Sequence, residues 1–274
     1  MARLGIIAGA GALPGQIISA CRDNGRDHYV LAFTGSADPD LLGNAPRKWI
    51  RIGNLSAALE EARKAGIEEL VMVGKIPRPG ILELIRDPRS AMFLTKVGTR
   101  ILGDDNLLSA VVRELEETEG FRVISPESLL KELMAPAGHY GDVQPNANEM
   151  KDIRRGLVVV HELGRLDIGQ AAIVQNGLVL GVEGAEGTDR LIERCIEYID
   201  PGVSGGVLVK AAKPMQDRRI DLPAIGVSTV AAVAKAGLRG IAVEEDRALL
   251  VGKDEMIKAA DLAKIFLFGV PFEC

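Results

Sequence analysis

Near its start the chain reads Leu4-Gly5-Ile6-Ile7-Ala8-Gly9-Ala10-Gly11-Ala12-Leu13-Pro14-Gly15, an apolar run that passes into a glycine-rich loop. A short, continuous apolar run is typical of a buried parallel strand. Pro14 fits the first turn of a helix, where its missing N–H removes no hydrogen bond, so a helix is predicted over residues 14–24. A strand, a glycine loop and a helix in this order indicate an α/β fold.

The same alternation continues to about residue 124. Strands are predicted at 29–33, 69–73 and 121–124, and helices at 56–65 and 107–119. Strands that alternate with helices build a parallel sheet. Residues 135–148 are rich in Pro, Gly and Asn and show no periodicity, which predicts a linker between two domains.

The second half also contains both strands and helices. Asn176-Gly177 stands between two apolar runs, a pattern that predicts a hairpin. A helix from residue 188 is expected to have Thr188 or Asp189 as its N-cap, and another is predicted over 225–236. The sequence therefore predicts an α/β protein with two domains: an N-terminal Rossmann-like parallel-sheet domain, residues 1–135, and a C-terminal mixed α/β domain, residues 136–274.

Composition and charge exclude several classes of protein. The formal net charge is −5 and aromatic residues make up 4% of the chain, so nucleic-acid binding is not expected. No apolar stretch reaches the roughly 18 to 20 residues that span a bilayer, and the first apolar run is too short for a signal peptide. Cys21, Cys195 and Cys274 show no CxxC spacing, which is typical of structural thiols in a reducing compartment. We expect a cytoplasmic protein.

The glycine loop after the first strand is a candidate phosphate site. Glycines let the backbone approach a phosphate, and the helix that follows offers free N–H groups. Gly9 and Gly11 match the start of a dinucleotide fingerprint, but Pro14 occupies its third glycine position and Gly15 comes one residue late. This mismatch counts against NAD. Two interpretations stay open: a tight strand-to-helix turn, or a loop that contacts a phosphate or nucleotide through Gly9, Gly11, Ala12 and Leu13.

Charged residues follow further predicted strands of the first domain. Lys75 and Arg78 lie among two prolines and two glycines, with Arg100 further along the chain. Cations at strand ends of an open sheet can neutralise a diphosphate, although each is more often a solvated surface charge. Asp104 and Asp105 precede a predicted helix, where they either cap it or bind a metal ion or a ribose.

Acidic residues gather in predicted loops of the second domain. Asp167, Glu183 and Asp189 flank the predicted hairpin, and carboxylates at strand ends suit Mg²⁺, which takes oxygen ligands. Asp167 and Asp189 are equally well explained as turn or cap residues. Asp221 stands between a basic stretch, 210–219, and the start of a helix. Phosphoryl transfer requires this combination of cations, a metal ion and a carboxylate that orients water.

Other hydrolytic sites are disfavoured. His28, His139 and His161 show neither HExxH nor His-x-His spacing, so a zinc site or a histidine-based triad is not expected.

Several motifs together resemble a known family. They are the opening segment 4–14, Gly103-Asp104-Asp105, Asp167-Ile168-Gly169-Gln170, Val182-Glu183-Gly184-Ala185-Glu186-Gly187-Thr188-Asp189 and Asp221-Leu222-Pro223-Ala224-Ile225-Gly226. Their order and length closely resemble the LpxI family of UDP-2,3-diacylglucosamine pyrophosphatases, and the resemblance covers essentially the whole chain.

The resemblance implies an activity and a cofactor. It implies Mg²⁺-dependent hydrolysis of UDP-2,3-diacylglucosamine to UMP and 2,3-diacylglucosamine 1-phosphate (lipid X), with water attacking the β-phosphorus, in lipid A synthesis of Gram-negative bacteria. The substrate is implied to lie between the two domains. The essential aspartate of the family falls on Asp221.

Roles for the candidate residues follow as hypotheses. The catalytic residues are expected to be Asp221, Lys213 and Arg219, and the magnesium ligands Asp221, Asp189 and Glu183. Substrate is expected to contact the glycine loop, Gly9 to Leu13, together with Lys75, Arg78, Asp104, Asp105 and Thr188. Residues such as Met92, Phe93 and Leu94 either line a place for the acyl chains or belong to the core.

Two other functions remain as alternatives. A Rossmann-type oxidoreductase would bind a nicotinamide cofactor, and a nucleotide-sugar sensor would bind its ligand without releasing UMP. A lipid substrate also suggests peripheral contact with the cytoplasmic face of the inner membrane, although no basic amphipathic helix is evident from the sequence. A homodimer is a further expectation.

Overall fold

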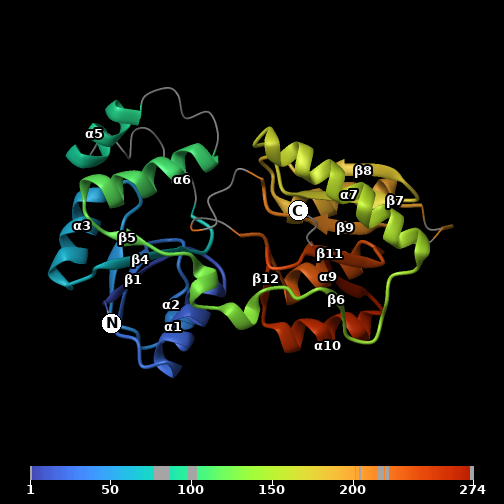
Figure 1. Cartoon of the computed structure of the whole chain (residues 1–274), viewed down its shortest axis with the longest axis horizontal. Coiled ribbons are helices and arrows are strands. Elements are labelled where there is room, and N and C mark those ends of the chain that lie inside the picture. Colours follow the sequence, from blue (N-terminus) through green and yellow to red (C-terminus); the bar gives the residue numbers. More distant parts are fainter. Residues whose placement is uncertain are drawn as a thin grey trace. The chain divides into compact units, whose positions relative to one another are not determined.

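A computed structural model of the chain describes residues 2–76, 87–97, 104–200, 202–203, 205–214, 219 and 222–271, without the side chains of 94, 97 and 104–107. The chain divides into two compact units (Figure 1). Unit 1 comprises Met1–Lys131 and a short segment, Asp217–Asp221, and unit 2 comprises Glu132–Gln216 and Leu222–Cys274. Three of the candidate site residues, Arg78, Arg100 and Asp221, lie outside the described residues.

Unit 1 contains a five-stranded parallel sheet. Its strands are β1 (Leu4–Ala8), β2 (His28–Phe33), β3 (Arg47–Ile50), β4 (Glu69–Val73) and β5 (Arg122–Val123). They run in the order β3-β2-β1-β4-β5, and every pair is parallel. This is the order of a doubly wound sheet, so the predicted Rossmann-like fold of the first half is confirmed.

Helices cover both faces of this sheet. They are α1 (Leu13–Asp23), α2 (Pro39–Leu42), α3 (Leu55–Lys64), α5 (Pro88–Val97) and α6 (Asp104–Arg113), which runs on into the π-helical turn η2 (Glu114–Thr118). Figure 1 shows α1 and α2 on one side of the sheet and α3 and α6 on the other. Leu4, Ile6 and Ala8 of β1 are fully buried between these layers, as the unbroken apolar run predicts.

Unit 2 contains a six-stranded mixed sheet. Its strands are β6 (Gly138–Tyr140), β7 (Ala171–Gln175), β8 (Leu178–Val182), β9 (Val207–Lys210), β11 (Gly240–Glu244) and β13 (Phe266–Val270), in the order β6-β13-β11-β9-β7-β8. The central β9, β11 and β13 are parallel, whereas β6 and β7 run antiparallel to their neighbours. The mixed α/β fold predicted for the second half is therefore confirmed.

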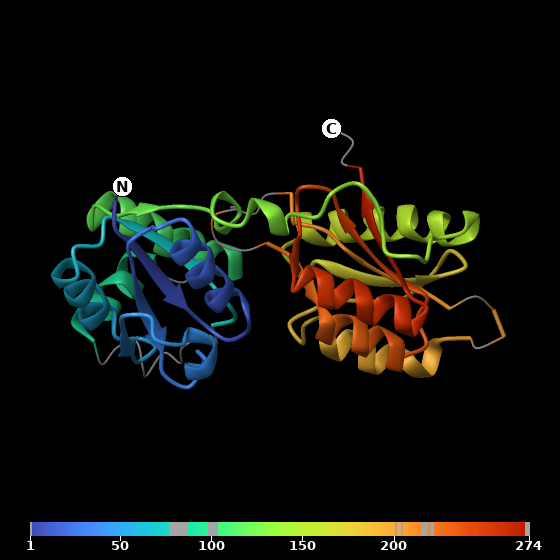
Figure 2. The ribbon, with the colours of Figure 1, turned by 90° about the horizontal axis from the view of Figure 1, so that it is seen from below.

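The helices of unit 2 also form two layers. Helix α7 (Ala147–Arg165) packs on one face, and α8 (Thr188–Cys195), α9 (Val227–Lys235) and α10 (Lys253–Ala263) pack on the other (Figure 2). A small second sheet pairs β10 (Ala224–Gly226) with β12 (Leu249–Val251). The described cysteines, Cys21 and Cys195, are free thiols in the two cores, and burial raises the pKa of each.

Three local predictions were wrong. Residues 138–140 lie in the predicted linker but form β6, because their pairing with β13 supplies order that a non-periodic segment lacks. The helix predicted over 225–236 begins two residues later, at Val227, because Ile225 and Gly226 belong to β10. Helix α8 has Gly187 as its N-cap, with φ 80° and no side-chain cap bond, so neither Thr188 nor Asp189 fills that position.

Candidate active site at the strand ends

The glycine loop of unit 1 is joined to the loop that follows β4. Ala10 and Lys75 exchange two backbone hydrogen bonds, of 2.8 and 2.9 Å. A Cβ on Gly9 would lie 2.5 Å from the carbonyl oxygen of Lys75, and one on Gly74 would lie 2.6 Å from that of Ala10. Only glycine permits two backbones to approach this closely. The structure therefore brings together two predicted substrate-binding segments.

This junction occupies a favourable place in the sheet. Strands β1 and β4 are neighbours, and the chain leaves β1 toward β2 on the other side. The carboxyl ends of β1 and β4 therefore form the topological switch point, where doubly wound sheets bind ligands. Ala12, the N-cap of α1, makes no side-chain cap bond, and Gly11 has a φ of 100° with open space around its Cβ position. The backbone N–H groups from Gly11 to Leu13 can thus face a phosphate.

The structure describes only some of the charged side chains expected beside this loop. Lys75 is exposed, as a cation that meets a soluble ligand must be. Asp104 and Asp105 begin α6, but their side chains lie outside the described atoms. Of the apolar candidates on α5, Phe93 is buried and Met92 is 54% exposed.

A second group of candidates meets at one edge of the unit 2 sheet. Strands β9 and β11 end at this edge and β7 begins there, since Ala171 pairs with Lys210. Lys213, three residues beyond β9, donates from Nζ to Oδ1 of Asp167 at 2.6 Å, and its side chain is 11% exposed. Asp167 has a φ of 54°, and its Oδ2 is buried and accepts no hydrogen bond from the described part of the chain.

Glu183 links two loops at the same edge. Its Oε2 accepts the backbone N–H of Gln170 at 2.9 Å, and its Oε1 accepts the hydroxyl of Thr188 at 2.7 Å. A Cβ on Gly169 would lie 2.1 Å from the carbonyl oxygen of Glu183, so glycine is required there. The predicted residues Glu183 and Thr188 are thus in direct contact, and Glu183 is buried.

The predicted magnesium ligands fit the ion by their chemistry. Carboxylate oxygens suit Mg²⁺, and each Glu183 oxygen keeps a second lone pair. Asp189 is exposed in the first turn of α8, next to Thr188. Among the residues that the structure describes, no three His, Cys, Asp or Glu side chains form a ready metal-binding group, and the third predicted ligand, Asp221, lies outside them.

Arg219 has a different environment from Lys213. Its Nη1 lies 2.9 and 3.0 Å from the two carboxylate oxygens of Glu116, and both residues belong to unit 1. A guanidinium paired in this way has part of its charge neutralised in the described structure. Lys213 belongs to unit 2, so the two predicted catalytic cations are held by separate units.

Sequence reasoning missed a polar group beside Lys213. Nε2 of His161, on α7, lies 2.7 Å from Oε1 of Glu244, the last residue of β11. Oε2 of Glu244 accepts the backbone N–H of Ala212 at 3.3 Å. Lys210 is buried, and its Nζ donates to the carbonyl of Ala224 at 3.3 Å. A charged residue that ends an otherwise apolar strand was the available signal, and both Lys210 and Glu244 carry it.

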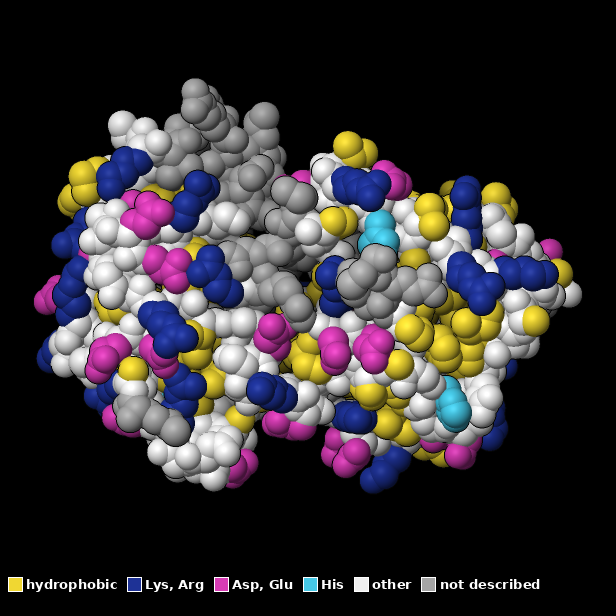
Figure 3. Space-filling model, in the orientation of Figure 1, with side chains coloured by type: hydrophobic (Ala, Val, Ile, Leu, Met, Phe, Trp, Pro, Cys, Tyr) yellow, Lys and Arg dark blue, Asp and Glu magenta, His cyan; other side chains and the backbone are white. Residues whose placement is uncertain are grey.

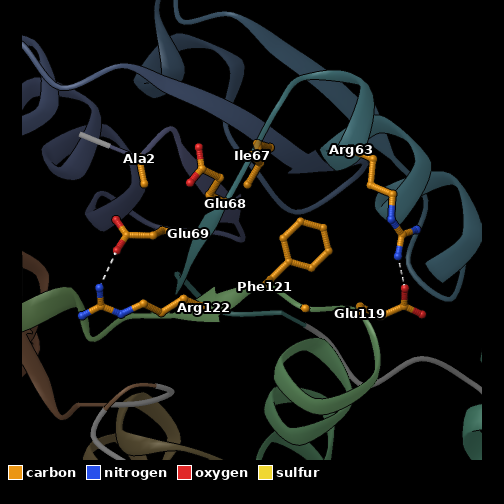
Figure 4. Close-up of a pocket in the computed structure, with 9 residues that line it drawn as sticks. Ala2, Arg63, Ile67, Glu68, Glu69, Glu119, Phe121 and Arg122 are labelled. Atoms are coloured by element: carbon orange, nitrogen blue, oxygen red, sulfur yellow. Dashed lines mark hydrogen bonds and ion pairs between the residues drawn. The ribbon is translucent and has the colours of Figure 1, made fainter.

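A hollow on unit 1 lies elsewhere. It has a volume of about 470 Å³ and lies at the amino ends of β4 and β5, the edge opposite the glycine loop. Figure 4 shows two ion pairs in it, Arg122 with Glu69 at 3.0 Å and Arg63 with Glu119. Its lining holds two arginines and three glutamates, so the net charge of the hollow disfavours an anionic ligand.

Comparison with known proteins places both halves in one family. The model of the LpxI N-terminal domain matches residues 3–133, and that of the LpxI C-terminal domain matches residues 136–268. The UDP-2,3-diacylglucosamine pyrophosphatase LpxI of Caulobacter vibrioides is 40% identical over 278 residues, which cover 98% of each chain.

Proposed function

Because the chain belongs to the LpxI family, we propose that it hydrolyses UDP-2,3-diacylglucosamine to UMP and 2,3-diacylglucosamine 1-phosphate, as a step of lipid A synthesis in a Gram-negative bacterium. The observation that carries this proposal is the 40% identity to a relative of that name along 98% of both chains. An enzyme that acts on a pyrophosphate bond also needs anion-binding groups, and the strand ends of the two units supply them.

Each unit contributes a distinct part to the proposed reaction. In unit 1, backbone N–H groups from Gly11 to Leu13 bind phosphate oxygens of the nucleotide, with Lys75 adding positive charge. In unit 2, Lys213 neutralises the charge that develops on the phosphates as water attacks the β-phosphorus. Its ammonium is held by Asp167 and is largely shielded from solvent, so it is oriented before substrate arrives.

Mg²⁺ is the proposed cofactor, with Asp221, Asp189 and Glu183 as the residues that hold it. When bound, such an ion supplies charge neutralisation at the diphosphate and activation of water. The contact of Thr188 with Glu183 supports a shared task for these residues, because a hydroxyl that orients a ligating carboxylate also sets its lone-pair direction.

The test is a hydrolysis assay with the purified chain. UDP-2,3-diacylglucosamine is incubated with Mg²⁺, and UMP and lipid X are measured; a parallel reaction contains EDTA. The proposed function expects both products with Mg²⁺ and little of either with EDTA. Thermal shift with NAD and NADP is measured alongside. Stabilisation by a dinucleotide without release of UMP would support an oxidoreductase, and stabilisation by substrate without products would support a sensor.

We also propose peripheral contact with an anionic membrane, through the exposed face of α7. No helix in the described residues is both long and apolar enough to cross a bilayer. Basic side chains gather over α7 in Figure 3, although the chain as a whole has a net charge of −5. Arg154 and Arg155 are exposed on α7, and so is Val158, at 57%. Beyond the end of the helix, Leu166 and Ile168 are 70% and 48% exposed. Association of two chains is a further proposal, testable by sedimentation.

A further inference from the structure

We propose that His161 accepts the proton of the attacking water, with Glu244 as the residue that positions its imidazole. This inference rests on the proposed hydrolytic function and adds a catalytic residue to it. The supporting observations are the geometry of the His161–Glu244 pair, its place at the strand ends, and the open second nitrogen of the ring.

Glu244 fixes the ring of His161 and its tautomer. The carboxylate is 3% exposed and lies 2.7 Å from Nε2 of His161. A carboxylate only accepts hydrogen bonds, so Nε2 carries the hydrogen and donates it, and Nδ1 of the neutral ring is left with a lone pair. His161 itself is 32% exposed, so this lone pair can reach a ligand or water. A ring held by a buried carboxylate on one nitrogen and open on the other is arranged for proton transfer.

The pair lies next to the described segment that follows β9. Gly164 follows His161 by one helical turn, and a Cβ on Gly164 would lie 3.1 Å from Cα of Lys213 and 2.9 Å from Pro214. Glu244 also accepts the backbone N–H of Ala212. The same carboxylate therefore holds both the imidazole and the backbone that presents Lys213. The proton acceptor and the charge-neutralising ammonium are brought to one edge of one sheet.

The charges around His161 come from three elements. Glu244 reaches it from β11, and Lys213 with its partner Asp167 comes from the loops packed against the end of α7. On α7 itself, Glu162 and Arg165 are exposed and pair with each other. Lys213 is already paired with Asp167, so Glu244 is the charged group in direct contact with the imidazole.

The proposed step is a balanced hydrolysis. The water oxygen forms a bond to the β-phosphorus while one water proton passes to Nδ1 of His161. The bond between the β-phosphorus and the bridging oxygen breaks, and its electron pair leaves with UMP. The imidazolium, stabilised by Glu244, then releases its proton to solvent through its exposed edge. Nε2 keeps its hydrogen throughout.

The test compares His161→Asn with His139→Asn in the full-length protein. His139 is an exposed histidine on β6 of the same unit, so it is a matched control. We expect kcat of H161N to fall by about a hundredfold or more with a much smaller change in KM, whereas H139N keeps the rate of the unmodified enzyme. We also expect the acidic limb of the pH profile, on which kcat/KM falls as the base becomes protonated, to be absent from H161N. Imidazole added to the His161→Ala variant should raise the rate of that variant about tenfold.

Each result decides between catalysis and structure. If H161N is folded and keeps both the rate and the acidic limb, His161 is not the base. The proposal would also fail if H161N had a lower rate but kept the acidic limb of the pH profile, and imidazole did not rescue His161→Ala. That result would indicate a structural role for His161. Glu244→Gln should lower kcat with the fold retained, and Glu244→Asp should recover part of it. The unmodified enzyme separates the two hypotheses: if it releases no UMP, the proposed function itself fails.

Discussion

Nζ of Lys213 lies 2.6 Å from Oδ1 of Asp167, across 46 residues of sequence. Asp167 adopts a left-handed backbone conformation at the end of α7, with a φ of 54°, and this conformation aims its carboxylate at the segment that follows β9. The ion pair holds the ammonium at the strand ends of unit 2. Two residues that the sequence analysis treated as separate charges thus form one ion pair.

Replacing Asp167 by Asn tests the role of this ion pair. Asn tolerates the left-handed conformation, so the change removes charge while the backbone is kept. We expect the free energy of unfolding to fall by about 1–3 kcal/mol, because the ammonium of Lys213 loses a partner in a shielded place. We also expect kcat to fall, since Lys213 is no longer held in one orientation. Urea unfolding and the UMP assay measure the two effects; an enzyme unchanged in both would show that the pair is incidental.

Substitution of Gly169 is a second test, of the close backbone packing at this edge of the unit 2 sheet. A Cβ there would lie 2.1 Å from the carbonyl oxygen of Glu183, a backbone atom that cannot move away cheaply. Gly169→Ala is expected to lower the free energy of unfolding by about 1–3 kcal/mol. Gly184→Ala is the control, because its nearest neighbour is the far end of the Glu186 side chain, at 2.8 Å, and its effect should stay within about 0.5 kcal/mol. Equal stability of the two variants would contradict the steric argument.

The fold could be predicted where local signals agree. The apolar run 4–8 is buried on both faces of its sheet and matches β1 residue for residue. Strand β3 was not predicted, because Arg47 and Lys48 make it read as a polar segment; it is an edge strand, where such charges are common. Strand β6 was missed for a related reason, since its order comes from pairing with β13, where Gly138 lies opposite Gly269, far along the chain.

The candidate site was predictable in part. Glycine and carboxylate motifs identified the loops, because close backbone approach and metal binding need particular residue types at local spacing. The contact of His161 with Glu244 spans 83 residues, and only the sheet order β11-β9-β7 brings the two together. Arg219 shows the converse: it is close to Lys213 in sequence, but it pairs with Glu116 within unit 1, whereas Lys213 belongs to unit 2. The spacing of residues along the chain does not predict these contacts, because they form only in the folded structure.

Asp221 is the residue on which the catalytic hypothesis most depends. Asp221→Ala is expected to fold normally and to bind substrate, while kcat falls by about a hundredfold or more, because the variant lacks a carboxylate that binds Mg²⁺ or orients water. Circular dichroism melting checks the fold, and binding is measured by thermal shift with substrate. A variant that turns over at a near-normal rate would remove Asp221 from the catalytic residues.

Membrane contact through α7 is testable with vesicles. The basic side chains of Arg154 and Arg155 should be attracted to anionic phospholipid, and the exposed Val158, Leu166 and Ile168 can insert among headgroups. We expect the protein to sediment with phosphatidylglycerol vesicles and much less with phosphatidylcholine vesicles, and salt should weaken the binding because it screens exposed charges.

The matched charge variants decide whether α7 is the contact face. At about 1 kcal/mol for each basic residue near an anionic surface, R154Q/R155Q should bind roughly 30-fold more weakly. K235Q/K258Q removes the same charge from α9 and α10, on the opposite face of the sheet, and should bind like the unmodified protein. If both double variants lose affinity equally, the attraction comes from overall charge and not from the face of α7. If neither binds less than the unmodified protein, these four side chains do not contribute to membrane contact.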